Sequence, residues 1–167
     1  MNFDVEKKLN DDLFELNEVE KEINKNKISR ISSFLTNYAV IKASGSIEST
    51  FKSILYKQII EHNCQTSHQR IHQFFEKMII KSSTNPSPDN ILDFLAKFEK
   101  EWKKELSKKL SEYKEENTKD LRYDLNSLVQ LRNQIAHGTN CTESIGTIMG
   151  YYKSGIEVLK ILDNILE

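Results

Sequence analysis

Apolar residues recur every three or four positions along most of the chain, which is the spacing that gathers them on one face of an α-helix. The first such pattern predicts a helix over residues 3–25, with acidic residues on its opposite side. Its apolar positions are Leu9, Leu13, Leu16, Val19 and Ile23. Residues 24–27 are polar and interrupt the pattern. This helix therefore either joins a bundle or serves as an arm for dimer contact.

The pattern continues through the middle of the chain. It predicts a long second helix over residues 29–62 and a third over residues 67–80. Ser87 fits a helix N-cap and Pro88 the first helical position, so a fourth helix is predicted over residues 88–116. The apolar stripe of this fourth helix consists of Ile91, Phe94, Leu95, Phe98, Trp102, Leu106 and Leu110.

Two further helices complete the predicted fold. One starts near Thr118, which we expect to cap it, and ends at Gly138. The last runs from about Glu143 and should pack back antiparallel against its predecessor. The pattern as a whole predicts an all-α fold, an antiparallel bundle of about five to six helices.

Composition narrows the class of protein. A chain of 167 residues suffices for a single domain, residues 1–167, with an N-terminal helix or arm at 1–27 and a core bundle at 29–167. The net charge of −1 gives no global attraction to nucleic acid. No basic and apolar leader and no apolar run of membrane-spanning length is present, and the two cysteines lie far apart. We expect a soluble, cytoplasmic protein with reduced thiols and no membrane contact.

The fifth predicted helix carries an arginine on its apolar face. On a helical wheel one arc holds Leu121, Leu125, Leu128, Ile135 and Ala136. Arg132 falls within this arc, where a guanidinium is costly unless it is paired or opens onto a cleft. Glu48 lies in a similar apolar arc of the second helix. We therefore expect Glu48 to pair with Arg132 and to orient it at the edge of the core.

His137 follows at the end of the same helix. Gly138 is suited to the left-handed conformation that ends a helix, which places His137 in the last turn. The negative end of the helix dipole favours a protonated imidazole there, and histidine is the usual group for acid–base catalysis. Arg132 lies about 140° away round the wheel. The alternative is a structural ion pair of Arg132 and a His137 without a chemical role.

Polar side chains share the arc of His137. They are Tyr123, Asn126, Gln130 and Asn133, a plausible set of hydrogen-bonding groups for the phosphates and bases of RNA. Asn133 is the strongest of them because it adjoins Arg132. Ordinary solvent-facing residues are the alternative.

Two other groups have weaker chemical interpretations. His62, Cys64, His68 and His72 suggest zinc, but residues 65–67 should interrupt the helix and no compact ligand quartet results, so no metal site is predicted. Lysines alternate with acids on the outer face of the fourth helix, namely Lys103, Lys104, Lys108 and Lys109. Mixed charge of this kind is typical of a solvated face, and contact with RNA phosphates is the alternative.

The segment Arg132-Asn133-Gln134-Ile135-Ala136-His137 resembles the Arg-x4–6-His motif of HEPN-superfamily domains. It is most similar to the stand-alone RiboL-PSP-type nucleases of prokaryotic toxin–antitoxin and phage-defence loci, over residues 29–166. This resemblance implies an endoribonuclease without metal or cofactor, working as a homodimer whose two motifs face one cleft. Thr139 stands where HEPN toxins paired with nucleotidyltransferase antitoxins have tyrosine, which argues against that subgroup.

The function expected from residues and resemblance together is metal-independent cleavage of RNA by attack of its own 2′-hydroxyl. His137 would act as acid or base, and Arg132 would stabilise charge on the phosphorus. Two alternatives remain open. One is a non-catalytic HEPN-like module that binds a partner, such as an antitoxin or an ATPase from the same locus. The other is a helical metalloprotein that uses the histidine and cysteine cluster.

Overall fold

The computed structural model describes residues 3–25, 30–60, 68–83 and 85–166. Every regular element within these residues is helical, which confirms the predicted all-α class. The elements are α1 (Phe3–Lys25), α2 (Arg30–Lys57), α3 (Gln69–Phe75), the short π-helix η2 (Glu76–Ile80), α4 (Pro88–Leu95), α5 (Lys100–Asn117), α6 (Leu121–Ala136) and α7 (Ile145–Leu166). These seven α-helices of the described segments exceed the five to six predicted.

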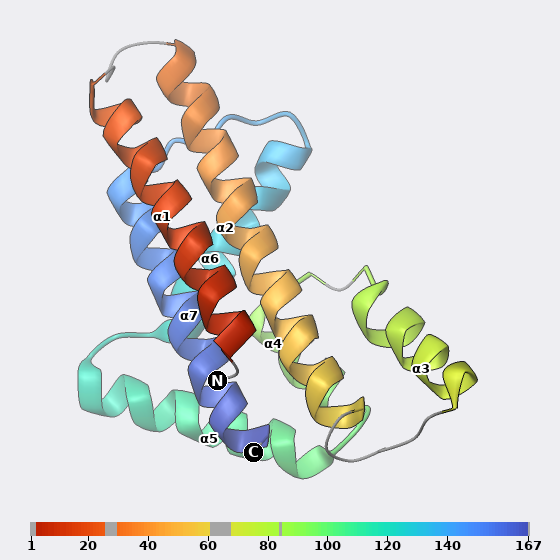
Figure 1. The fold of residues 1–167 in the computed structure, drawn as a ribbon. Helices are drawn as coiled ribbons and strands as arrows, with labels where there is room; N and C mark the ends of the chain where they lie inside the picture. The colour runs from red at the N-terminus through yellow and green to blue at the C-terminus, as the bar shows by residue number, and fades with distance from the viewer. Residues whose placement is uncertain (1–2, 26–29, 61–67, 84, 167) are drawn as a thin grey trace.

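Helix α2 occupies the centre of the bundle and contacts α1, α6 and α7. Figure 1 shows α1 running antiparallel to α2, and α6 antiparallel to α7, as the short connection between the last two helices predicts. Helix α5 crosses one end of the bundle. Helix α3 stands to one side and has no buried residue of its own. The core lies between α1, α2, α6 and α7, and buried residues of η2, α4 and α5 extend it.

The predicted fourth helix is divided into α4 and α5, which is one source of the larger helix count. Ser87 caps α4 by accepting a hydrogen bond from the Asn90 N–H, and Pro88 is the first helical residue, as expected. The chain then turns, and Glu99 has an extended backbone before α5 begins. The turn allows Phe94 and Phe98 to pack with ring centroids 5.7 Å apart. No glycine or proline marks this break, so side-chain periodicity could not reveal it.

The prediction that Thr118 caps the fifth helix is wrong. Thr118 ends α5 instead, with a left-handed φ of 53°. Asp120 caps α6, because its carboxylate accepts a hydrogen bond of 3.0 Å from the Tyr123 N–H. Lys114 lies 2.7 Å from the same carboxylate and holds the pKa of Asp120 below its usual value. This contact fixes the end of α5 against the start of α6.

Helix α1 packs into the bundle through buried Val5, Leu9, Leu16 and Ile23. A polar cluster between these helices joins α1 to its neighbours. Ser46 donates a hydrogen bond of 2.6 Å to Asp12 and lies 2.9 Å from the hydroxyl of Tyr152. Lys42 lies 2.9 Å from Asp12. Since a shift of α1 along its axis would leave these buried groups unpaired, the cluster fixes the register of α1 against α2 and α7.

Helices α2 and α7 approach most closely at Gly155. A Cβ atom added there would lie 2.8 Å from Cδ1 of Ile47 and 2.9 Å from its Cγ1. Both distances are below van der Waals contact, so only glycine permits this separation of the helix axes.

Candidate active site

The helix that carries the motif is anchored at its start. Arg122 donates hydrogen bonds to the carbonyl of Ser107 at 3.0 Å and to its hydroxyl at 2.7 Å, which joins α6 to α5. Ser154 donates a hydrogen bond of 2.6 Å to Asp124, which joins α6 to α7. The buried residues of α6 all belong to its first nine positions, namely Leu121, Leu125, Leu128 and Val129. The first half of α6 is thus fully packed, while in its second half Leu131 and Ile135 are partly buried and the alternate positions are exposed.

The helix ends as the glycine predicts. Gly138 has a φ of +86° and donates a hydrogen bond of 2.9 Å to the carbonyl of Ile135. Thr139 donates another of 2.9 Å to the carbonyl of Gln134. This pair of hydrogen bonds is a Schellman motif, which satisfies two carbonyls that the helix leaves open. His137 is the C-cap residue, so its position is fixed by the backbone on both sides.

Arg132 is exposed, which corrects the expectation of a guanidinium within the apolar arc. Leu131 and Ile135, which flank Arg132 in the sequence, are partly buried against the core. Near its end, α6 therefore turns these two side chains inward and leaves Arg132 in solvent.

The predicted pair of Glu48 and Arg132 is wrong. Glu48 lies 2.5 Å from the ammonium of Lys52, one turn further along α2. Lys52 is buried and also donates a hydrogen bond of 2.5 Å to the carbonyl of Ser82. The acid in the apolar arc of α2 is thus paired with a lysine four residues further along the same helix. Through Lys52, Glu48 serves the junction of α2 with the segment after η2, and within the described residues no hydrogen bond or ion pair joins it to Arg132.

Arg132 contacts its neighbour instead. Its Nη1 donates a hydrogen bond of 3.2 Å to Oδ1 of Asn133. Within the described residues no carboxylate lies within 4.0 Å of the Arg132 guanidinium, and the exposed imidazole of His137 makes no hydrogen bond. Both charged or titratable groups of the motif are therefore open to a ligand, and Asn133 is in place to orient the arginine.

Of the four polar residues predicted to contact RNA, three are exposed on α6 and Asn133 is half-buried. Tyr123 is 65% exposed, and Asn126 and Gln130 are exposed as well. Tyr123 and Gln130 line a polar groove of about 260 Å³ between α6 and the start of α7. The groove's other lining residues are Ser127, Leu131, Gln134, Thr142, Glu143 and Tyr151, of which Gln134 belongs to the motif segment. Asn126, Arg132 and His137 do not line it.

Asn37 is a further contributor that the sequence analysis missed. From α2 it donates a hydrogen bond of 2.9 Å to Oδ1 of Asn140 and accepts one of 2.9 Å from the backbone N–H of Cys141. The loop that follows His137 is therefore attached to the central helix of the bundle. A contact between residues more than 100 positions apart leaves no periodic signal that could have identified it.

The lysines of α5 have acidic partners. Lys103 lies 2.7 Å from Asp93, Lys104 lies 2.6 Å from Glu101, and Lys109 lies 3.1 Å from Glu112. Lys108 lies 3.6 Å from Glu112. These exposed pairs favour the interpretation of a solvated face over contact with RNA phosphates.

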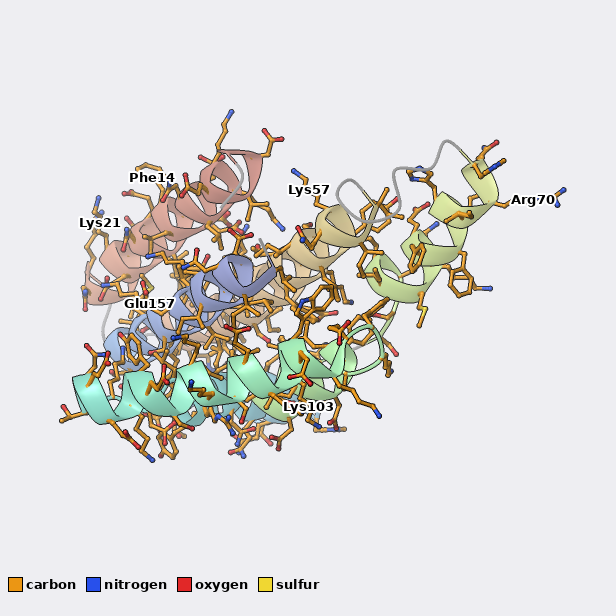
Figure 2. The ribbon with its side chains drawn as sticks, turned by 90° about the horizontal axis from the view of Figure 1, so that it is seen from below. Phe14, Lys21, Lys57, Arg70, Lys103 and Glu157 are labelled. Carbon is orange, nitrogen blue, oxygen red and sulfur yellow. The ribbon has the colours of Figure 1, made fainter. Side chains whose placement is uncertain are left out.

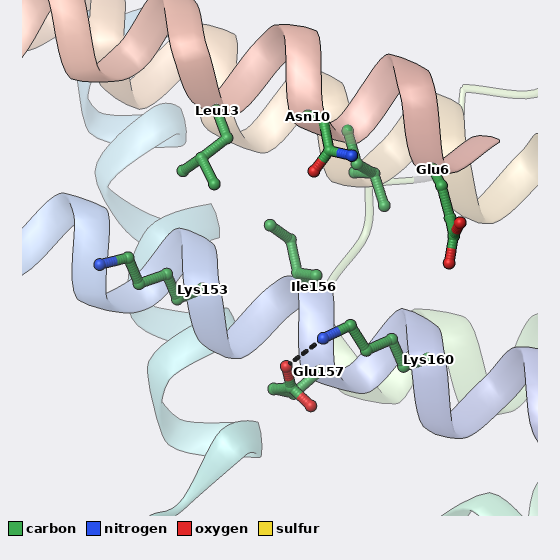
Figure 3. Close-up of a pocket in the computed structure, with 8 residues that line it drawn as sticks. Glu6, Asn10, Leu13, Lys153, Ile156, Glu157 and Lys160 are labelled. Atoms are coloured by element: carbon green, nitrogen blue, oxygen red, sulfur yellow. Dashed lines mark hydrogen bonds and ion pairs between the residues drawn. The ribbon is translucent and has the colours of Figure 1, made fainter. Parts of the chain in front are cut away.

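Neither of the remaining features adds chemistry to the motif. In the part of the chain that the structure describes, no three His, Cys, Asp or Glu residues are grouped to hold a metal, while His62 and Cys64 lie outside that part. A groove of about 400 Å³ runs between α1 and α7, and Figure 3 shows Lys153 and Lys160 on its α7 side. No motif residue lines it. Among the described helices none is long and apolar enough to cross a membrane.

The family follows from the sequence match around this site. A model of the RiboL-PSP-HEPN family matches residues 7–167. The chain belongs to this family. The match includes nearly all of α1 and extends to the end of α7, so the RiboL-PSP-HEPN unit is the whole bundle with its motif on α6. Comparison with curated proteins and with solved structures gives no match. Family membership confirms the resemblance drawn from Arg132 to His137.

Proposed function

We propose that this RiboL-PSP-HEPN protein is a metal-independent endoribonuclease that acts as a toxin or phage-defence effector. One observation carries the proposal. The family model covers almost the entire chain, and the two motif side chains, Arg132 and His137, are exposed on the last turns of α6 without a carboxylate partner among the described residues. A structural ion pair, the alternative for Arg132, would have required such a partner.

The chemistry needs only groups that RNA and this chain supply. The 2′-hydroxyl of RNA attacks the adjacent phosphorus, the new O2′–P bond forms and the bond from phosphorus to O5′ breaks. His137 removes the proton from the 2′-hydroxyl or delivers one to the leaving O5′. Arg132, oriented by Asn133, stabilises the negative charge that builds on the phosphoryl oxygens. The products carry a 2′,3′-cyclic phosphate and a 5′-hydroxyl.

A homodimer would supply groups that this mechanism needs and that one chain lacks. One chain provides a single motif histidine, whereas in-line cleavage benefits from both an acid and a base. Arg132 and His137 also project about 140° apart round α6, so one chain does not readily turn both toward one phosphate. Two chains whose motif ends face each other would supply two histidines and two arginines to one cleft.

The flanking polar residues would hold the RNA strand. Tyr123, Asn126 and Gln130 are exposed along the face of α6 that leads to His137. The tyrosine ring offers a stacking surface for an unpaired base, and the amides offer donors and acceptors to base edges. This arrangement favours single-stranded RNA over a duplex.

The test is incubation of purified protein with transfer RNA and total RNA in excess chelator. His137→Ala and Arg132→Ala should each abolish cleavage, while Arg70→Ala, an exposed arginine on α3 that Figure 2 shows pointing into solvent, should retain it. Cleavage that survives in both motif variants would contradict the assignment. A wild-type protein that leaves every RNA intact but forms a stable complex with an antitoxin or ATPase would favour the non-catalytic partner module.

A further inference from the structure

The polar groove between α6 and the start of α7 lies on the helix face that leads to the motif histidine. On α6 it is lined by Tyr123, Ser127, Gln130 and Gln134, which are spaced by four, three and four residues and so share one face. His137 follows about 60° round the wheel from Gln134 and about 4.5 Å further along the axis. A ligand in the groove therefore has the imidazole of His137 directly beyond it.

Both walls of the groove are held in place before any ligand binds. At one end Ser154 of α7 donates a hydrogen bond of 2.6 Å to Asp124 of α6. At the other end Asn37 of α2 accepts a hydrogen bond of 2.9 Å from the N–H of Cys141, two residues before Glu143. Since little ordering is then needed on binding, such a groove is suited to selective recognition.

The charge of the groove excludes phosphate as its occupant. Among the described residues that line it, none is lysine or arginine, and Glu143 carries the single formal charge. The Glu143 carboxylate has no cationic partner in the part of the chain that the structure describes. A carboxylate without a nearby cation repels an anion, and it can only accept hydrogen bonds. The groove therefore suits a neutral ligand that donates hydrogen bonds.

Two tyrosines make this ligand an aromatic one. Tyr123 lines the groove from α6 and is 65% exposed, while Tyr151 lines it from α7 and is half-buried. Burial raises the pKa of Tyr151, and the charge of Glu143 raises it further, so the carboxylate lies within electrostatic reach of the phenol. Aromatic side chains are the usual stacking partners of unpaired bases. The volume of about 260 Å³ lies just below the roughly 300–1,000 Å³ of sites for drug-sized molecules, as suits a single base.

We propose that the groove binds a guanine base of the RNA and that Glu143 selects it by accepting hydrogen bonds from N1–H and the N2 amino group. The inference rests on the proposed function and names its substrate preference. Guanine alone offers two neighbouring donors on its Watson–Crick edge. Adenine and cytosine place one amino donor beside a ring-nitrogen acceptor, and uracil places one donor between two carbonyls. A carboxylate is repelled by each of those acceptors.

The groove also supplies donors for the other edge of guanine. The side-chain amides of Gln130 and Gln134 make no hydrogen bond to other described residues, and each can donate to O6 or N7 of the base. With the base held there, its ribose lies toward His137, so the 2′-hydroxyl that attacks belongs to the bound guanosine. Cleavage therefore falls at the phosphate on the 3′ side of guanine.

The test is a titration with the four nucleoside 3′-monophosphates in chelator, followed by nuclear magnetic resonance of the ring protons of Tyr123 and Tyr151. Wild type should bind guanosine 3′-monophosphate about tenfold or more tightly than the other three, because a bidentate base contact discriminates by at least this factor. Glu143→Gln should lose most of this preference. Glu105→Gln should keep it, since Glu105 is exposed on α5 and does not line the groove.

Two further probes separate the roles of the side chains. Inosine 3′-monophosphate lacks the N2 amino group, so wild type should bind it about tenfold more weakly than the guanosine nucleotide, whereas Glu143→Gln should distinguish the two poorly. Tyr123→Ala should weaken all four nucleotides by a similar factor, because stacking on an aromatic ring tolerates every base. A carboxylate with a merely structural role would not change the ratio of guanosine to inosine binding.

The remaining outcomes are decisive as well. Equal binding of the four nucleotides by wild type, or an undiminished guanine preference in Glu143→Gln, overturns the proposal. Binding of none of them also overturns it and leaves the groove to a donor such as an arginine of a partner protein. Selective binding of the guanosine nucleotide without any RNA cleavage would refute the proposed nuclease and keep the guanine site. RNA cleavage with no preference for the 3′ side of guanine would do the reverse.

Discussion

Gly155→Ala tests the close approach of α2 and α7. Alanine stabilises a helix interior by about 1 kcal/mol relative to glycine, so the exchange taken alone should raise the free energy of unfolding. Here the new Cβ would lie 2.8 Å from Cδ1 of Ile47, a fully buried side chain. Overpacking of this kind costs about 1–3 kcal/mol, so we expect a net loss of about 1 kcal/mol.

Gly150→Ala provides a matched control on the same helix, because a Cβ added at Gly150 meets no atom within 4 Å. Both variants gain the same helix propensity, so their difference isolates the steric cost. We expect Gly150→Ala to be more stable than Gly155→Ala by about 2 kcal/mol in urea unfolding followed by circular dichroism, with unchanged m-values. Equal stability of the two variants, within about 0.5 kcal/mol, would refute the reasoning. Ile47→Val, which removes the nearest atom, should reduce the cost of Gly155→Ala.

Two other perturbations follow from the contacts described. Burial raises the pKa of Tyr152 to about 12. An unfolded tyrosine titrates near 10, so between these two pH values the folded protein keeps the phenol proton and the unfolded chain loses it. The free energy of unfolding should therefore fall by about 2–3 kcal/mol as the pH rises through this window. Tyr152→Phe, followed by urea unfolding across pH 9–12, should flatten the decline, and an equally steep decline in the variant would assign it to other groups. Asn37→Ala should lower the free energy of unfolding by about 1 kcal/mol, because the Cys141 N–H loses its acceptor. Hydrogen exchange at the Cys141 amide should become faster in this variant, and an unchanged exchange rate would contradict the role of Asn37.

Much of the fold could be predicted because local rules agree with the tertiary structure. The first helix was predicted over residues 3–25 and is Phe3–Lys25, since its apolar spacing matches a face that becomes buried. The cap at Ser87 and the end of α6 at Gly138 followed from the chemistry of those residues alone. Where a single residue type determines the local backbone conformation, the sequence alone is sufficient to predict where a helix begins or ends.

The errors arose where position in three dimensions decides. A helical wheel gives the direction of a side chain but not whether another element covers it. The wheel therefore predicted a buried Arg132, whereas this side chain is exposed. The wheel also could not identify the ion-pair partner of Glu48, which is Lys52 on the same helix and not Arg132 on α6. The role of Asn37 depends on the packing of α2 beside the loop after α6, which no local pattern records.

The exposure of Arg132 and His137 at the end of α6 has a consequence for how this gene can change. Replacing either residue removes no buried contact, so a single substitution would silence the proposed chemistry and leave the free energy of unfolding within about 0.5 kcal/mol of its original value. Core positions of α6 such as Leu125 lack this freedom. If the proposed nuclease function holds, mutational loss of activity and mutational loss of the folded protein are therefore separate events, and inactive descendants of this chain would persist as intact bundles.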